Sequence, residues 1–275
     1  MTKAMAAASR FTAGGLAAIA LASVLGGLVA GCATTSQQQT AKELNMPSEQ
    51  TDARRRARIR LELAAGYFED GKTEVALDEL QQVLTIDPNF ADAFNLRGLA
   101  YMRLGDMRAA EENFRRAAAL NPSDGDVQNN YGWLQCQQGR YAEAQRSFEQ
   151  ALASPLYGGR ARTFLAMGVC QARAGQLEPA EHSLVRSYEL DAANPVTGYS
   201  LSQVLYQRGE FQRAQFYIRR INNSEQANAE SLWLGIKVEN RLNEKQAMSQ
   251  LSDTLRKRYP QSSQRASLDR RAFDE

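Results

Sequence analysis

The stretch 98-GLAYMRLGDMRAAEENFRRAAALNP-122 decides the fold, because its small, aromatic and turn-forming residues recur at a fixed period. The recurring residues are Gly98, Tyr101, Gly105, Ala110 and Phe114. The chain has a matching set 34 residues earlier (Ala64, Tyr67, Gly71, Ala76, Leu80) and another 34 residues later (Gly132, Gly139, Ala144, Phe148). A repeat of this length is typical of one helix pair per unit. The sequence therefore predicts an all-α fold.

The same pattern continues toward the C-terminus. After a two-residue extension around residues 156–159 it returns in a fourth unit, and two weaker units follow. Six units, beginning near residues 57, 91, 125, 161, 195 and 228, account for residues 54–260. In the sixth unit Leu242 stands where the others have glycine, as expected of a terminal, capping unit. Residues 261–275 are polar and are expected to form a frayed tail or a short extra helix.

Each kind of recurring residue has a physical reason. Small residues such as Gly98 and Ala110 let two helices approach closely. Glycines such as Gly105 suit the left-handed position at the end of the first helix. Pro88 and Pro122 stop the second helix, because proline lacks the donor that a continuing helix needs. The pattern resembles the tetratricopeptide (TPR) repeat, and the resemblance implies a right-handed superhelix of six helix-turn-helix repeats with a concave face.

The N-terminus has the three parts of an export signal. Lys3 and Arg10 begin it, an uncharged run over residues 11–30 follows, and Ala30 and Gly31 provide small residues at its end. These features predict a signal peptide over residues 1–31. An uncleaved N-terminal anchor is the competing interpretation, because the run is long enough to span a bilayer.

Val29-Ala30-Gly31-Cys32 resembles the bacterial lipobox. The resemblance implies that Cys32 carries a covalent lipid and becomes the first residue of the mature protein, and several acyl chains on one residue make a durable anchor. Ala33, rather than aspartate, follows the cysteine, which implies sorting to the outer membrane. Residues 32–53 are rich in Thr, Ser and Gln and are predicted to be a flexible tether, with the folded part beginning near Arg54.

The charge balance limits the class of partner. The formal net charge is +2 and becomes zero without residues 1–31, because Lys3 and Arg10 are the only charged residues there. A balanced chain disfavours nucleic acid, whose phosphates require a basic surplus. The Arg-rich stretch 54-RRRARIR-60 is interpreted as a solvated helix face, with an acidic partner or lipid head groups as the alternatives.

The residue types provide no candidate for catalysis. His182 is the only histidine, so a Ser-His-Asp triad or a histidine-rich zinc site has at most one imidazole, and we interpret this residue as a surface or boundary residue. Glycines occur singly and form no phosphate-binding loop. The protein is therefore predicted not to be an enzyme, and to use no metal, no small-molecule substrate and no cofactor apart from the lipid on Cys32.

Two further cysteines lie in the first helices of adjacent units. Cys136 occupies position twelve of its unit and Cys170 position ten of the next, which suggests that their side chains point in different directions. Two buried, unpaired cysteines are the favoured interpretation. A disulfide, which an oxidising periplasm would permit, is the alternative.

The concave surface remains as a candidate binding site. In TPR folds, positions two, five, nine, twelve and thirteen of the first helix share one side. The predicted partner-binding residues are Asn95, Leu99, Met102, Asn129, Trp133, Leu165, Val169 and Tyr199. The asparagines would hold backbone groups of an extended or amphipathic segment, and the apolar side chains would anchor it. The alternative is that this apolar stripe packs against neighbouring helices or the protein's own tail.

Several motifs together point to one family. The chain has 129-NNYGWL-134, 139-GRYAEA-144, the inserted Leu156-Tyr157, 232-LWLGIK-237 and 255-LRKRYP-260 after its lipobox. From Cys32 to about Pro260 it resembles the PilF/PilW family of type IV pilus biogenesis lipoproteins. The resemblance implies a pilotin, an outer-membrane lipoprotein that brings a PilQ-like secretin to that membrane and promotes its multimerisation. A periplasmic TPR scaffold for a protease or cell-wall enzyme is the alternative.

Overall fold

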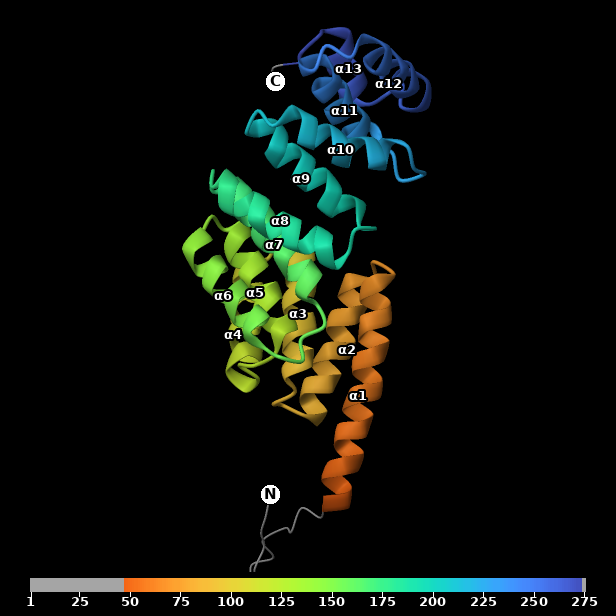
Figure 1. Cartoon of the computed structure of the whole chain (residues 1–275). Helices are drawn as coiled ribbons and strands as arrows, with labels where there is room; N and C mark the ends of the chain where they lie inside the picture. The colour runs from red at the N-terminus through yellow and green to blue at the C-terminus, as the bar shows by residue number, and fades with distance from the viewer. Residues whose placement is uncertain (1–46, 274–275) are drawn as a thin grey trace, which may run out of the picture. The chain divides into compact units, whose positions relative to one another are not determined.

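The structure, a computed structural model, describes residues 47–273. Thirteen α-helices and no strand occur within these residues (Figure 1). They are α1 (Pro47–Glu69), α2 (Thr73–Ile86), α3 (Ala91–Leu104), α4 (Met107–Leu120), α5 (Gly125–Gln137), α6 (Tyr141–Ala153), α7 (Arg160–Arg173), α8 (Leu177–Leu190), α9 (Pro195–Gln207), α10 (Phe211–Asn222), α11 (Ala229–Arg241), α12 (Lys245–Arg258) and α13 (Ser263–Asp269). None of the thirteen combines the length and the apolar content needed to cross a bilayer. The predicted signal peptide and the acylation site Cys32 lie outside the described residues.

The first twelve helices form six pairs. Each odd-numbered helix from α1 to α11 packs on the helix that follows it, and each even-numbered helix from α2 to α10 packs on the next odd-numbered one. Neighbouring odd-numbered helices also touch, from α1 and α3 to α9 and α11. In such a stack each pair buries its apolar faces only against its neighbours. The predicted all-α repeat is confirmed. After the six pairs, residues 263–269 form the short helix α13.

The first helix begins earlier than predicted. It starts at Pro47 rather than near Arg54, so the prediction that the tether reaches residue 53 is wrong. Proline is favoured in the first turn of a helix, where its missing N–H costs nothing. The Arg-rich stretch lies mainly in solvent, with the side chain of Arg54 63% exposed, and Arg60 Nη1 pairs with Glu79 Oε2 of α2 at 2.7 Å.

Close approach of two helices in a pair depends on a residue without a side chain. A Cβ on Gly132 of α5 would lie 2.9 Å from the ring of Phe148 of α6, which is closer than carbon atoms pack. The Phe148 ring is fully buried and is part of a core cluster with Ala144, Met167 and Cys170. A small residue at the position of Gly132 therefore makes room for the large side chain at the position of Phe148.

The turn inside each pair requires a left-handed residue. In the first five pairs this residue is a glycine at φ +76° to +81° (Gly71, Gly105, Gly139, Gly175, Gly209). In the sixth pair it is Asn243 at φ +59°, whereas Leu242 has φ −87°. Asparagine tolerates this conformation better than most other residues with a side chain. The prediction that Leu242 occupies the glycine position is therefore wrong by one residue.

The N-caps explain this shift. Asn194 caps α9 and Asn228 caps α11, each accepting hydrogen bonds from backbone N–H groups of the first turn. The two caps are 34 residues apart, so the sixth unit begins at Ala229 rather than 228.

The two-residue extension ties the third and fourth pairs together. Tyr157 is 8% exposed, and its hydroxyl lies 2.9 Å from Thr163 Oγ1 of α7. Thr163 Oγ1 in turn donates to Asn129 Oδ1 of α5 at 2.9 Å. The neighbouring Leu156 is 97% exposed, so Tyr157 rather than Leu156 anchors the extension.

A disulfide joins the same two pairs. Cys136 of α5 and Cys170 of α7 are bonded, with their Cα atoms 5.8 Å apart and both side chains buried. The favoured interpretation of two unpaired cysteines is therefore wrong. Neighbouring helices of a stack present opposite sides to each other, so the side chains that meet come from different repeat positions. Positions twelve and ten face each other for this reason.

Candidate partner-binding groove

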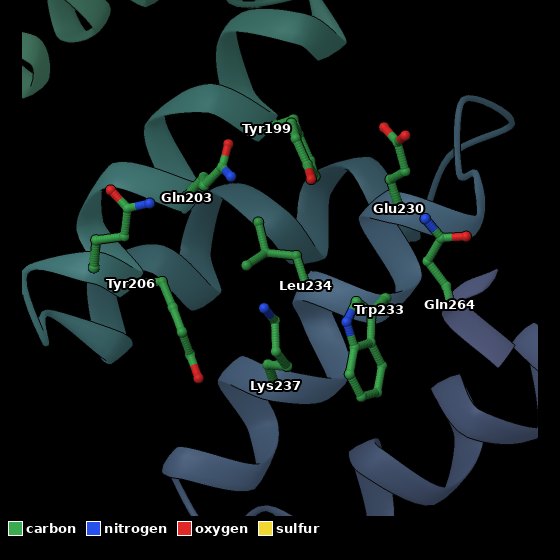
Figure 2. A pocket seen from close by; sticks show the side chains of 9 residues that line it. Tyr199, Gln203, Tyr206, Glu230, Trp233, Leu234, Lys237 and Gln264 are labelled. Atoms are coloured by element: carbon green, nitrogen blue, oxygen red, sulfur yellow. The ribbon is translucent and has the colours of Figure 1, made fainter. Parts of the chain in front are cut away.

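A cavity of about 370 Å³ lies between α9 and α11. Side chains from both helices converge on it, with Gln264 of α13 at its edge (Figure 2). Its lining residues are Tyr199, Gln203, Tyr206, Gln207, Glu230, Trp233, Leu234, Lys237 and Gln264. On each helix these residues are one, three or four positions apart, which places them on one broad side of that helix.

A second cavity of about 310 Å³ lies between α7 and α9. It is lined by Val169, Ala172, Arg173, Leu184, Ser200, Gln203, Val204 and Gln207. Gln203 and Gln207 line both cavities, so the two adjoin along α9. We call the two cavities together the C-terminal groove.

The charged side chain of Lys237 lies close to two aromatic rings in the first cavity. Lys237 Nζ lies 5.3 Å from the centre of the Tyr206 ring and 5.9 Å from that of Trp233, within the range of a cation–π contact. Burial lowers the pKa of Lys237 from its usual value, because it disfavours the charged form. At the other end of the cavity, burial and the nearby Glu230 carboxylate raise the pKa of the Tyr199 hydroxyl. The cavity thus presents a partly desolvated positive charge beside apolar ring faces.

The protein's own C-terminal segment contacts two residues that line this cavity. The Phe273 ring stacks on Trp233 with centroids 5.7 Å apart and planes at 26°. The Tyr206 hydroxyl donates to the backbone carbonyl oxygen of Phe273 at 3.4 Å. The alternative that part of the concave surface packs against the tail is therefore correct at this end.

Comparisons with known proteins agree with this architecture. Models of the TPR repeat match residues 66–105, 89–156 and 132–195. The type IV pilus assembly protein PilF of Pseudomonas aeruginosa is 28% identical over 230 residues, which make up 84% of this chain and 89% of PilF. The crystal structure of PilW, a widely conserved type IV pilus biogenesis factor, is 28% identical with a TM-score of 0.73, covering 77% of this chain and 97% of PilW.

The chain belongs to the TPR family and is homologous to PilF and PilW. A structure of Pseudomonas aeruginosa PilF supports the same conclusion, with a TM-score of 0.72 at 26% identity over 81% of this chain and 99% of that one. The resemblance to PilF and PilW that the motifs indicate is confirmed. TPR folds of this kind act as scaffolds, and residues 47–273 contain no group of three or more histidine, cysteine, aspartate or glutamate side chains placed to hold a metal ion. His182 is exposed, as predicted.

Only part of the predicted site lines the C-terminal groove of this TPR stack. Tyr199 lines the first cavity and Val169 the second. Leu165 is half-buried and packs in the core around α7 and α9. Leu99 and Met102 are half-buried against the cluster that contains Phe114.

The remaining predicted residues make contacts within the protein. Asn129 is 4% exposed and bonded to Thr163 and Asn130, so the prediction that it holds a partner's backbone is wrong. Asn95 Oδ1 accepts from Asn130 Nδ2 at 3.2 Å. Trp133 is half-buried, and the Arg173 guanidinium lies 5.0 Å from its ring centre.

Because the sixth unit was predicted to begin one residue too early, two residues that line the first cavity were missed. Counting from 228 puts Leu232 and Ile236 at positions five and nine, but both are fully buried core residues. Counting from Ala229 puts Trp233 and Lys237 there, and both line the cavity. The Asn194 and Asn228 caps were the sequence signal that could have found them.

Proposed function

We propose that the protein is an outer-membrane pilotin, a lipoprotein acylated at Cys32 that binds the type IV pilus secretin and promotes its localisation and multimerisation. The observation that carries this proposal is the match along 89% of PilF and 97% of PilW, proteins whose names place them in type IV pilus assembly and biogenesis. The C-terminal groove, in a fold that acts as a scaffold, supports a role in binding another protein.

The proposed mechanism combines an anchor with a docking surface. Acyl chains on Cys32 would hold the protein at the membrane, and residues 33–46 could span up to about 50 Å between that anchor and α1. A secretin subunit bound in the C-terminal groove would then stay near its site of insertion. Tethering raises its local concentration, which favours assembly without any new contact.

Replacing the acylated residue tests the anchor. In a Cys32→Ala variant we expect a folded protein that is absent from the outer membrane, and loss of nearly all secretin multimers there, because the lipid provides the membrane affinity. The measurement is the amount of heat-resistant secretin multimer in outer-membrane fractions at matched protein levels. Thr34→Ala, two residues further along, is the matched control and should behave as wild type. Normal multimers in the Cys32→Ala strain would reject the pilotin role.

Removing the positive charge of Lys237 tests the docking surface. Lys237→Gln keeps a long polar side chain but removes the charge, and we expect it to weaken capture of the purified secretin about tenfold. Lys245→Gln is the control, because Lys245 is exposed at the start of α12 and lies outside both cavities. Binding is measured by titration, and thermal unfolding should be the same for both variants. Equal affinities would place the secretin site on another face.

A further inference from the structure

The C-terminal segment is held against the groove by specific contacts. Leu268 of α13 is 5% exposed and packs with Leu232, Ile236 and Leu255 of α11 and α12. Asp269 pairs with Arg265 Nε at 2.9 Å and lies 3.6 Å from Arg256 Nε of α12. These contacts fix the position from which the last described residues leave the helix.

A sharp turn then directs the chain back toward α11. Arg271 has φ +53°, a left-handed conformation that is unusual for a residue with a side chain. Backbone hydrogen bonds from Ala272 N to Ser267 O at 3.0 Å and from Phe273 N to Arg271 O at 2.9 Å close the turn. The turn delivers the Phe273 ring to the face of Trp233.

The contacts between the groove and this segment are of the kind that a groove makes with a bound peptide. It contacts both an aromatic side chain, through Trp233, and a backbone carbonyl, through the Tyr206 hydroxyl. Arg241 Nε donates to the oxygen of the same hydroxyl at 3.4 Å, which leaves its hydrogen for the carbonyl of Phe273. A side-chain contact combined with a backbone hydrogen bond is the usual way a groove binds an extended segment.

Positive side chains of α11 lie close to Phe273, the last described residue. The sequence continues beyond Phe273 with Asp274 and Glu275, which lie outside the described residues. Lys237 lies over the Trp233 ring on which Phe273 stacks, and Arg241 is one helical turn further along α11. Burial lowers the pKa of Lys237, and a carboxylate close to its ammonium group would favour the charged form.

We propose that Phe273 is an intramolecular ligand of the C-terminal groove, and that a partner enters this cavity with an aromatic residue followed by acidic residues, the order found in the sequence Phe273-Asp274-Glu275, and displaces it. The identity of that partner as the secretin rests on the proposed function, whereas the contact of the protein's own segment does not. The free protein is therefore partly closed, and its apparent affinity for a partner is lower than the groove alone would provide.

A peptide supplied in trans tests this proposal. The probe is a labelled peptide of residues 270–275, RRAFDE, and the protein is the full acylated chain in detergent, as wild type and as Phe273→Ala. We expect the variant to bind the peptide at least about tenfold more tightly than wild type, because the wild-type segment competes at a millimolar effective concentration. Fluorescence anisotropy measures the binding, and circular dichroism confirms that the variant is folded.

Two altered peptides and one groove variant define the specificity. Replacing the phenylalanine of the peptide by alanine, or its two acids by their amides, should each weaken binding to the Phe273→Ala protein about tenfold. Adding Lys237→Gln to that protein should abolish the preference for the acidic peptide. Equal binding to wild type and variant, no binding to the variant, or indifference to the phenylalanine would each overturn the proposal.

The outcome is separable from that of the proposed function. If the peptide fails to bind while wild-type protein still assembles the secretin through Cys32, the intramolecular ligand is refuted and the pilotin role stands. If the peptide binds as expected while Cys32→Ala leaves secretin assembly normal, the pilotin role is refuted and the intramolecular ligand stands.

Discussion

Replacing Phe148 by alanine is expected to lower the free energy of unfolding by about 3–5 kcal/mol. The ring is fully buried between α5 and α6, and Gly132 opposite it has no side chain that could move into the space. The cavity would therefore stay open, and the cost of an open cavity adds to the loss of buried apolar area. Urea denaturation followed by far-ultraviolet circular dichroism measures the change.

A surface phenylalanine provides the matched control. Phe216 of α10 is 63% exposed, so Phe216→Ala should cost less than about 1 kcal/mol. A second test uses the glycine that faces the ring. Gly132→Ala should destabilise wild type, where the new Cβ would meet the Phe148 ring, but should cost less in Phe148→Ala, where only the backbone oxygen of Ala144, at 3.2 Å, remains close to it. Similar losses for Phe148→Ala and Phe216→Ala, or strict additivity with Gly132→Ala, would contradict this account of the core.

Removing the Cys136–Cys170 disulfide is expected to lower the free energy of unfolding by about 3–4 kcal/mol. The bond closes a loop of 34 residues and so restricts the unfolded chain. It also joins α5 to α7 directly, two helices that the chain otherwise connects only through α6. Loss of the bond should therefore weaken the coupling between the third and fourth pairs as well as the stability of the stack.

Reduction provides the cleanest measurement of this effect. Wild-type protein unfolded with and without dithiothreitol should differ by the full amount, whereas the double variant Cys136→Ala/Cys170→Ala should be insensitive to the reductant. Cysteine-specific labelling under denaturing conditions, before and after reduction, reports whether the two thiols are bonded. Identical wild-type denaturation midpoints with and without the reductant would show that the bond contributes nothing to stability.

The repeat architecture could be predicted because its determinants are local. A left-handed turn at Gly105, a small residue at Gly132 and a helix stop at Pro88 each express the requirements of a few neighbouring residues. These requirements recur at a fixed spacing, so the sequence shows them before any long-range contact is known. The family followed from motifs that lie within single units, and the comparisons confirmed it.

The candidate site was harder to predict, because it depends on register and on distant contacts. The repeat residues of the sixth unit are weak, so an error of one residue exchanged the core positions Leu232 and Ile236 for the groove positions Trp233 and Lys237. On a helix one residue is a rotation of about 100°, enough to move a side chain from the core to the surface. Asn129 was misplaced for another reason, since its partner Thr163 belongs to the next unit.

By itself, the amino-acid sequence determined that this protein is a stack of helix pairs, because the spacing of small residues, glycines and prolines acts within each pair. Only the tertiary structure decided which cysteines and side chains meet between pairs, such as Cys136 with Cys170 and Trp233 with Phe273. Contacts of this second kind join faces of different helices, and the facing sides are set by how the pairs pack rather than by any local pattern.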